Sequence, residues 1–363
     1  MNKITYIFSG GRINKFNNEL YAEEFFYGYK FLKNKYPNVS VIEFNTTRKF
    51  IKNIEHKISK VFSLPLYIFS IVDKKNIQTI KETDKLILVS ESAGFAALLP
   101  LIFLKKKYKI KTYMFVMGLY SKKINYKIFQ LFHSFFISLL VSYLDRIYFL
   151  GIEEFDIAKG RVRNHNKLVY KPFHIDYQFW NNPDVEIENN KQILFIGNDG
   201  NRDFDLLINV AKLMPEKEFT FVSSSAQIID LKISNVNVIR GNWKDGISDF
   251  DLKEIYETSR LVILPLKKST QPSGQSVALQ SMSVGIPVLI TKTEGFWDKQ
   301  EFLDSENIFF EESSELELWV KKINYLYDNT SLLNKVSRNA SLLIKEKFNI
   351  QDFNQFLLEE ISL

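Results

Sequence analysis

The residues best suited to chemistry lie in one stretch, Lys267 to Asp298, in which a polar loop leads into a short apolar helix and then a strand. We expect the loop at 269–276, the helix at 277–284 and the strand at 286–291. Flexible backbone N–H groups and the positive end of a helix dipole together stabilise a phosphate without a charged side chain. An ordinary helix and strand unit of an α/β protein explains the same pattern. The loop residues that we expect at a ligand are Gln271, Ser273, Gly274, Gln275 and Ser276.

Two glycine turns are further candidates for phosphate binding. Gly10 and Gly11 follow a predicted strand at 3–8, and the turn GNDGNRD, residues 197–203, follows a predicted strand at 192–196. Nucleotide-binding α/β domains commonly begin with strand, glycine turn and helix, although Gly10 and Gly11 lack the full dinucleotide fingerprint. Arg202 is the only basic residue of the second turn. Its guanidinium can bind phosphate oxygens bidentately, and a surface position at the start of a helix is the alternative.

Glu91 is a candidate for chemistry in the first half of the chain. It follows a predicted strand at 86–89 and precedes a predicted apolar helix at 93–104. Polar residues at the carboxyl end of a strand are site candidates in open α/β sheets. An acid in the first turn that only favours the helix dipole is the alternative.

Composition limits the classes of protein. With 363 residues, 45% hydrophobic and 25% charged, the chain is globular rather than disordered or fibrous, and it is long enough for two domains. The absence of cysteine excludes disulfides, thiolate nucleophiles and Cys-ligated zinc. The four histidines show no paired spacing, so we expect no metal.

Charge is distributed unevenly along the chain. Residues 1–180 contain 29 Lys and Arg against 14 Asp and Glu, and the remainder contains 19 against 28. The basic half includes Lys105 to Lys111 and a group formed by Lys122, Lys123 and Lys127, beside two very apolar predicted helices. This arrangement favours an anionic membrane surface as a partner, and core helices with solvated lysine ends are the alternative. We expect no binding to nucleic acid.

No secretory signal precedes the first predicted strand, so we expect a cytoplasmic protein, with peripheral contact to the inner face of the plasma membrane as a further hypothesis. Residues 128–150 approach the length of a transmembrane span. His133, Asp145 and Arg146 interrupt them, and a buried helix followed by a strand fits better.

Strands alternate with helices in both halves, which predicts two parallel sheets covered by helices. A helix is predicted at about 18–35, and a polar, Asn-rich linker at about 181–190. We therefore predict an N-terminal acceptor-binding domain at 1–180 and a C-terminal donor-binding domain at 181–345. A terminal helix at 346–363 would cross back to the first domain.

Four segments occur in the order typical of one family: VYKPFHIDYQFW, ILFIGNDGNRDFDLLINVAK, YETSRLVILPL and SGQSVALQSMSVGIPVLITKTEG. They resemble the donor domain and the preceding segment of retaining, nucleotide-sugar-dependent glycosyltransferases of the GT-B fold, a large family of bacterial glycan-assembly enzymes. The specific likeness covers about residues 192–348. It implies two Rossmann-like domains facing across a cleft and a nucleotide-diphosphate sugar as donor substrate, without a metal.

The resemblance also implies roles for single residues. The family's second conserved glutamate, which holds the ribose hydroxyls, is Gln280 here, and its first falls on Pro272 or Gln271. An amide still offers an acceptor to a hydroxyl. Arg202 and Asn198 stand where the family neutralises the diphosphate, and Gly197 opens that turn. Glu294 lies in the segment 293–298 at the end of the predicted strand, which we expect either to close over the donor sugar or to form a simple turn.

The resemblance implies a glycosyltransferase that moves a sugar from a nucleotide-diphosphate donor to a glycan or lipid-linked acceptor, in surface polysaccharide or glycoconjugate assembly. Arg202, Glu91 and Gln271 are the catalytic candidates. Because the leaving phosphate can itself take the acceptor's proton in a retaining transfer, the poverty of conventional acid and base pairs is compatible with this activity. Sugar-nucleotide epimerases or hydrolases of the same fold, and a non-catalytic module that binds anions or lipid, are the alternatives.

Overall fold

A computed structural model describes residues 3–16, 18–44, 49–122, 124, 126–242 and 246–362, with the backbone alone for 49–52 and 54. Lys123 of the basic group therefore lies outside the described residues. The chain divides into two compact units. Unit 1 contains residues 1–17, 26–172 and 357–363, and unit 2 contains 18–25 and 173–356. The predicted domain limits stay a prediction, because these units are groups of contacts and not domains shown to fold alone.

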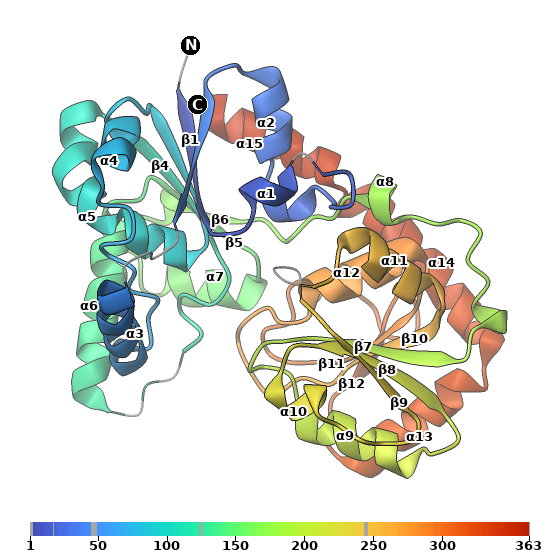
Figure 1. Ribbon diagram of the computed structural model, residues 1–363. Coiled ribbons are helices and arrows are strands. Elements are labelled where there is room, and N and C mark those ends of the chain that lie inside the picture. The colour runs from blue at the N-terminus through green and yellow to red at the C-terminus, as the bar shows by residue number, and fades with distance from the viewer. Residues whose placement is uncertain are drawn as a thin grey trace. The chain divides into compact units, whose positions relative to one another are not determined.

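Unit 1 contains a parallel sheet of six strands in the order β2-β1-β3-β4-β5-β6 (Figure 1). The strands are β1 Ile4–Ser9, β2 Val39–Phe44, β3 Lys85–Val89, β4 Lys111–Val116, β5 Arg146–Phe149 and β6 Leu168–Tyr170. The helices are α1 Ile13–Phe16, α2 Tyr29–Lys35, α3 Lys49–Phe62, α4 Lys74–Lys81, α5 Glu91–Tyr108, α6 Lys127–Ser142 and α7 Ile152–Lys159. The order of the strands reverses between β1 and β3, and ligands bind at such a reversal in open α/β sheets.

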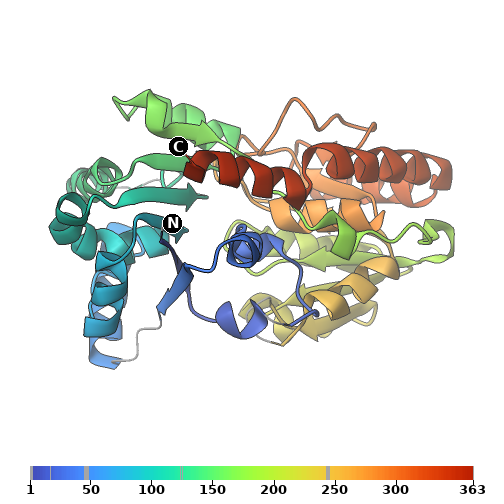
Figure 2. The same cartoon turned by 90° about the horizontal axis from the view of Figure 1, so that it is seen from above.

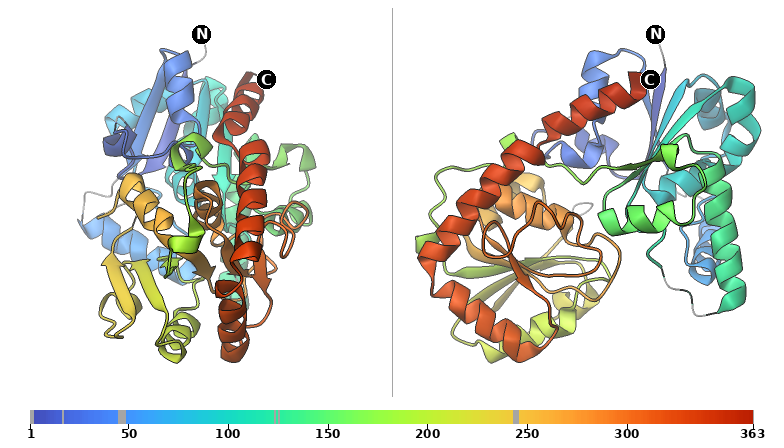
Figure 3. Two further views of the ribbon diagram at one scale, coloured as in Figure 1. Left: turned by 90° about the vertical axis from the view of Figure 1, so that its right-hand side faces the viewer. Right: turned by 180° about the vertical axis from the view of Figure 1, so that it is seen from behind.

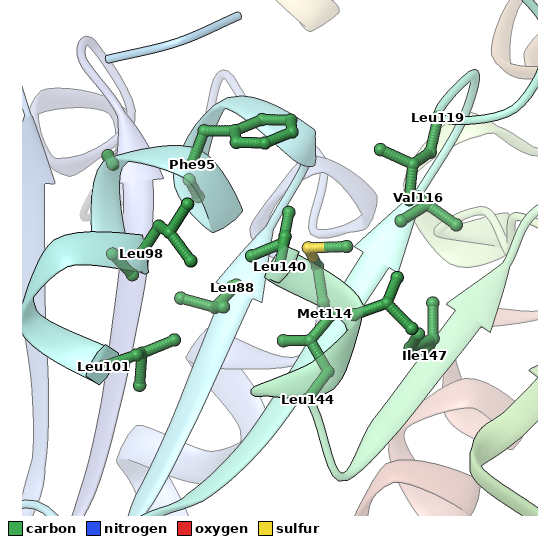
Figure 4. Close-up of a cluster of buried hydrophobic side chains, with 14 of the residues drawn as sticks. Leu88, Phe95, Leu98, Leu101, Met114, Val116, Leu119, Leu140, Leu144 and Ile147 are labelled. Carbon is green, nitrogen blue, oxygen red and sulfur yellow. The ribbon is translucent and has the colours of Figure 1, made fainter. Parts of the chain in front are cut away.

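Helices cover both faces of the unit 1 sheet. Figures 1 and 3 show α4, α5 and α6 on one side and α2 on the other. Alternate strand residues such as Leu88, Met114 and Ile147 pack on α5 and α6 in a fully buried cluster (Figure 4). Because consecutive strand residues point to opposite faces, Tyr6 and Phe115 are buried on the other side. The near-continuous apolar strands are what a sheet covered on both faces requires.

Unit 2 contains a second parallel sheet of six strands, in the order β12-β11-β10-β7-β8-β9. The strands are β7 Gln192–Ile196, β8 Glu218–Ser223, β9 Val236–Arg240, β10 Ser259–Leu264, β11 Val288–Thr291 and β12 Phe309–Glu311. The helices are α8 Tyr177–Trp180, α9 Phe204–Leu213, α10 Ala226–Ile229, α11 Asp249–Glu257, α12 Gln275–Val284, α13 Leu316–Tyr327 and α14 Thr330–Lys347. Counted within the unit this is the order 3-2-1-4-5-6 of a Rossmann fold, whose reversal lies between β7 and β10.

The last helix, α15 (Ile350–Ser362), spans the division between the units, because residues up to 356 belong to unit 2 and those from 357 to unit 1. Within unit 1, its Glu360 accepts a hydrogen bond from Tyr148 Oη at 2.9 Å. Within unit 2, residue Ile175 exchanges backbone hydrogen bonds with Phe348 and Ile350.

The prediction of one helix at 18–35 is wrong. Only α2 and a short 3-10 turn, Glu24–Phe26, are helical there, because Tyr27 and Gly28 both adopt positive φ (49° and 75°). The chain before them is held by unit 2 instead. Ala22 N donates to Asp249 Oδ2 at 3.1 Å, and Phe250 N donates to Leu20 O at 3.1 Å. Figure 2 shows this blue segment beside the gold α11.

The region at 128–150 is a helix followed by a strand, as predicted, but the helix is buried on one side only. Ile128, Leu131, Phe132 and Phe135 of α6 are exposed, whereas His133 is buried and its Nδ1 lies 2.9 Å from Phe62 O. In the described part of the chain no helix is both long and apolar enough to cross a membrane.

Candidate functional site

A pocket of about 310 Å³ lies in unit 2, at the carboxyl ends of the strands. Its wall begins with Ile196 at the end of β7, includes Val222 near the end of β8, and continues with Gly241 after β9. Ser276, Val277 and Gln280 of α12, the helix that follows β10, line the pocket as well. This is the position at which a doubly wound sheet binds ligands. The lining residues are Phe25, Ile196, Gly197, Asn198, Asp199, Arg202, Val222, Gly241, Asn242, Ile247, Asp249, Leu252, Ser276, Val277 and Gln280.

Arg202 is the only cation among the described residues of this lining, and it is 4% exposed. Its backbone is fixed by the turn, since Arg202 N donates to Asp199 O at 3.2 Å. Within the described residues, Nε and Nη1 make no hydrogen bond, although Nη1 lies 3.3 Å from the Asp199 carboxylate. Burial lowers the pKa of the guanidinium, and Asp199 opposes that shift. A buried cation with unused donors is suited to an anionic ligand.

Gly197 gives Arg202 its position. A Cβ at residue 197 would lie 2.4 Å from Arg202 Nε and 2.8 Å from its Cγ, so only glycine lets the side chain cross the turn. Asn198 ties the same turn to β8: its Oδ1 accepts hydrogen bonds from Ser224 N and, at 3.3 Å, from Ser223 Oγ. The turn therefore holds the guanidinium against the pocket by shape and by hydrogen bonds.

The turn at 197–203 and the loop at 269–276, which the sequence singled out separately, are joined in the structure. Asn201 Nδ2 donates to Gln271 Oε1 at 3.1 Å and to Ser273 Oγ at 2.8 Å. Gly274 caps α12 with a φ of 78°, a conformation that favours glycine, and Gln275 and Ser276 form the first turn. Of the loop residues, only Ser276 lines the pocket. Gln271 is used in holding the loop to the turn.

Gln280 lines the pocket one turn further along α12 and is 2% exposed. Its Oε1 accepts from Tyr256 Oη at 3.2 Å, and its Nε2 donates to Glu24 Oε1 at 3.1 Å. Glu24 also accepts from Trp180 Nε1 at 2.8 Å. Burial, and then the nearby Asp249 and Asp176 carboxylates, raise the pKa of Glu24 to about 8.

Sequence reasoning missed Glu24 and Phe25. Both belong to the segment predicted as a helix, and nothing in its sequence pattern indicates that it packs on unit 2. Asp249, which lines the pocket, lies in one of two Asp-Phe-Asp triplets, but that pattern indicates only the acidic first turn of α11.

Glu294 is exposed and lies outside the pocket lining. The residue after it, Gly295, packs directly on the loop: its N donates to Ser269 O at 2.8 Å, and a Cβ there would lie 2.5 Å from Gln271 O. The strand end that carries Glu294 thus supports the loop at 269–276. No group of three or more His, Asp or Glu residues placed for a metal occurs among the described residues.

Gly10, Gly11 and Glu91 belong to unit 1 and are not among the described residues that line the pocket of unit 2. Gly11 has a φ of 99° in the turn after β1. Glu91 begins α5, and its Oε1 accepts from Met117 N at 2.6 Å. Burial raises the pKa of Glu91. Ser90 before it has a φ of 101°, a strained conformation for a residue other than glycine, at the reversal point of this sheet.

Comparison with known proteins locates this chain among sugar-transferring enzymes. The family described as glycosyl transferases group 1 matches residues 178–342, which include the whole described lining of the pocket except Phe25. No curated protein matches the sequence.

Solved structures show the same fold over the full length. HepE from Anabaena, determined with UDP and glucose, has a TM-score of 0.68 at 14% identity and covers 100% of both chains. Sucrose-phosphate synthase from Thermosynechococcus elongatus has a TM-score of 0.70 at 11% identity, over 100% of this chain and 98% of that one. A glycosyltransferase from Rickettsia africae has a TM-score of 0.62 at 13% identity, over 99% and 97%. Residues 178–342 match the glycosyl transferases group 1 family, and the chain is a glycosyltransferase of the GT-B fold.

Proposed function

We propose that this glycosyltransferase moves a sugar from a nucleoside-diphosphate sugar to a glycan or lipid-linked acceptor, with retention of configuration. Its role would be in the assembly of surface polysaccharide or glycoconjugates. The observation that carries the proposal is Arg202, a buried cation in the wall of the unit 2 pocket whose Nε and Nη1 make no hydrogen bond within the described residues. The ligand that such a cation favours is a diphosphate.

The transfer needs little acid or base chemistry from the protein. The bond between the anomeric carbon and the diphosphate oxygen breaks, the acceptor oxygen bonds to that carbon, and the acceptor's proton goes to the departing phosphate. Negative charge grows on the diphosphate as it leaves. Arg202 and the positive end of α12 stabilise this charge more in the transition state than in the ground state. Retention is proposed from this chemistry together with the family resemblance.

A uridine diphosphate sugar is the first donor to test, because HepE was determined with UDP and glucose. The pocket has apolar walls for a base, with Ile196, Val222 and Leu252 on the side of the strand ends and α11. Its volume of about 310 Å³ lies at the lower end of the range for small-molecule sites.

The test is a thermal-shift screen with UDP, GDP, ADP and CMP, followed by turnover of the corresponding nucleotide sugars. A nucleotide that binds only the folded state at 100 times its Kd stabilises that state by about 2.7 kcal/mol, which raises Tm by a few degrees. We expect UDP to give the largest shift. No shift with any nucleotide would refute the donor site. If the donor is epimerised or hydrolysed without transfer, the result would favour a sugar-nucleotide epimerase or hydrolase. If a nucleotide binds but no sugar turns over, it would favour a non-catalytic binding module.

A membrane surface is proposed as the second partner, through the exposed side of α3 and α6 in unit 1. Exposed apolar residues of this face are Ile58, Val61, Ile128, Leu131, Phe132 and Phe135. Exposed lysines lie on or beside the same helices at Lys57, Lys60, Lys122 and Lys127. Apolar side chains with a lysine rim favour an anionic bilayer, and each lysine adds about 1 kcal/mol near the surface.

Co-sedimentation with vesicles of anionic phospholipid tests this partner. We expect binding at low salt that weakens at high salt, because lysines contribute through screened charge. Leu131→Ser with Phe135→Ser should abolish it without changing UDP binding. Equal binding to neutral vesicles, or none to anionic ones at low salt, would refute the proposal.

A further inference from the structure

The amide of Gln280 is held from two sides in the pocket wall. Tyr256 Oη donates to its oxygen at 3.2 Å, and its nitrogen donates to Glu24 Oε1 at 3.1 Å. Each contact uses part of the amide's capacity, which is two acceptor positions on the oxygen and two hydrogens on the nitrogen. One N–H and one acceptor position thus remain for a ligand. Which of them faces the ligand depends on the orientation of the amide.

Glu24 is itself fixed by contacts on both of its oxygens. Oε1 accepts from Trp180 Nε1 at 2.8 Å as well as from Gln280, and Oε2 accepts from Asp176 N at 3.2 Å. The residue is 1% exposed and is not part of the pocket lining. It therefore reaches a ligand only through Gln280.

The chain around Glu24 is anchored to unit 2 on both sides of the pocket wall. Ala22 N donates to Asp249 Oδ2 at 3.1 Å, and Glu23 N donates to Asp176 Oδ2 at 3.2 Å. The next residue, Phe25, lines the pocket. A segment near the amino end of the chain thus completes a site whose other lining residues come from beyond residue 195.

We propose that Glu24 is a positioning residue of the donor site, which holds the Gln280 amide so that a defined pair of donor and acceptor atoms faces the nucleotide. The inference rests on the proposed nucleotide site. Without Glu24 the amide can turn end for end, because only the Tyr256 contact then distinguishes oxygen from nitrogen. In the turned amide, the nitrogen lies where the oxygen would otherwise accept a hydrogen bond from the ligand hydroxyl.

The charge state of Glu24 is compatible with an anionic ligand nearby. Burial, and then the Asp249 and Asp176 carboxylates, raise the pKa of Glu24 to about 8, and Glu24 in turn helps to raise the pKa of the buried Tyr256. The raised pKa favours the neutral form of the carboxyl. In this form the carboxyl serves as an acceptor for two side-chain N–H groups and adds no negative charge beside the diphosphate.

A double-mutant cycle tests the inference, with UDP as the probe and its affinity measured by calorimetry at pH 7. Glu24→Ala and Gln280→Leu should each weaken UDP binding about tenfold, the effect of one lost hydrogen bond of about 1.4 kcal/mol. The double variant should bind UDP like Gln280→Leu alone, because Glu24 acts through that amide. Glu19→Ala, at an exposed position of the same segment, is the control and should bind like the wild type. The inference would be overturned if the double variant lost UDP affinity by the product of the two single losses. It would also be overturned if Glu24→Ala bound UDP within twofold of the wild type.

A second measurement separates this inference from the proposed function. Selective ¹⁵N-glutamine labelling gives the side-chain amide signals of Gln280 without ligand, assigned with Gln280→Leu. Glu24→Ala should shift them, and unchanged signals would overturn the inference. If the wild type binds no UDP but these signals shift, the choice of nucleotide fails and the positioning of Gln280 stands. Where Glu24→Ala does not fold, Glu24→Leu fills the same buried space without an acceptor and takes its place.

Discussion

The two units share one construction and differ in what lies at the carboxyl ends of their strands. Each has six parallel strands and a glycine turn after its first strand. In unit 2 a buried cation, Arg202, lies at this edge, and its Nε and Nη1 make no hydrogen bond within the described residues. In unit 1 two carboxyls at this edge hold the unit's own loop: Glu91 accepts from Met117 N, and Glu154 accepts from Gly118 N and Tyr120 N.

This difference teaches how one fold supports two tasks. A buried cation can still bind an anionic ligand when its only ion pair within the described residues is with one half-exposed carboxylate and two of its nitrogens make no hydrogen bond there. Carboxyls whose oxygens are taken by backbone N–H groups instead fix the shape of a loop. We therefore expect nucleotide binding to depend on unit 2 and to be nearly independent of the carboxyls of unit 1.

Arg202→Ala should have the largest effect. Loss of the guanidinium removes the stabilisation of the growing diphosphate charge, and removal of one such group typically lowers turnover by about 10² to 10³. UDP affinity should fall as well. Calorimetry and turnover of UDP sugars measure both quantities. Arg338→Ala, an exposed arginine of α14, is the matched control. Full activity in Arg202→Ala would end the assignment.

Gly197→Ala should have the next largest effect on turnover. The added Cβ would lie 2.4 Å from Arg202 Nε, so the guanidinium must move although its charge is kept. A displacement of about 1 Å can lower turnover by about 10². Gly200→Ala tests the same turn without a clash, because a Cβ there has no atom within 4 Å. Equal behaviour of the two variants would show that the position of Arg202 is not set by Gly197.

Glu91→Gln should leave UDP affinity within about twofold of the wild type, because Glu91 belongs to unit 1. If Glu91 has the predicted catalytic role, turnover should still fall by about tenfold or more. Loss of a general acid or base usually lowers turnover by more than that. Glu82→Gln, on the surface of the same unit, is the control. A change in UDP affinity without a change in turnover would remove Glu91 from the catalytic candidates.

Much of the fold follows from local sequence. β7 begins and ends at the predicted residues 192 and 196, and β11 ends at the predicted residue 291 but begins two residues later than predicted, because a run of β-formers meets turn residues at these ends. β12 was missed, since its three residues are too short for a pattern. The helix predicted at 18–35 failed because contacts with Asp249 and Asp176 outweigh local preference.

In the candidate site, too, residues of local motifs could be predicted, whereas contacts between distant segments could not. Gly197, Asn198, Arg202, Ser276 and Gln280 lie in two motifs that are continuous in sequence, and all five line the pocket. Glu24 meets Gln280 across 256 positions of the chain. No local pattern predicts such a contact, because it depends on the packing of two distant segments.

The smallest expected effect concerns stability in unit 1. Burial, and then the charge of Glu91, raise the pKa of Glu154 to about 8 from an ordinary value of 4.5. Between these values the folded state holds a proton that the unfolded state has released. The free energy of unfolding therefore falls as pH rises from about 4.5 to about 8, and this contribution then stays constant.

Glu154→Gln cannot release this proton, so its stability should depend less on pH over the same range. The amide keeps one acceptor for the two backbone N–H groups, so at pH 5 the variant should be less stable by about 1 to 3 kcal/mol. The deficit should shrink towards pH 8, because only the wild type loses stability there. Urea unfolding at pH 5, 6, 7 and 8 measures the difference, with UDP affinity unchanged. A deficit that stays constant from pH 5 to pH 8 would mean that Glu154 is already ionised in the folded protein, and the contrast between the two units would fail.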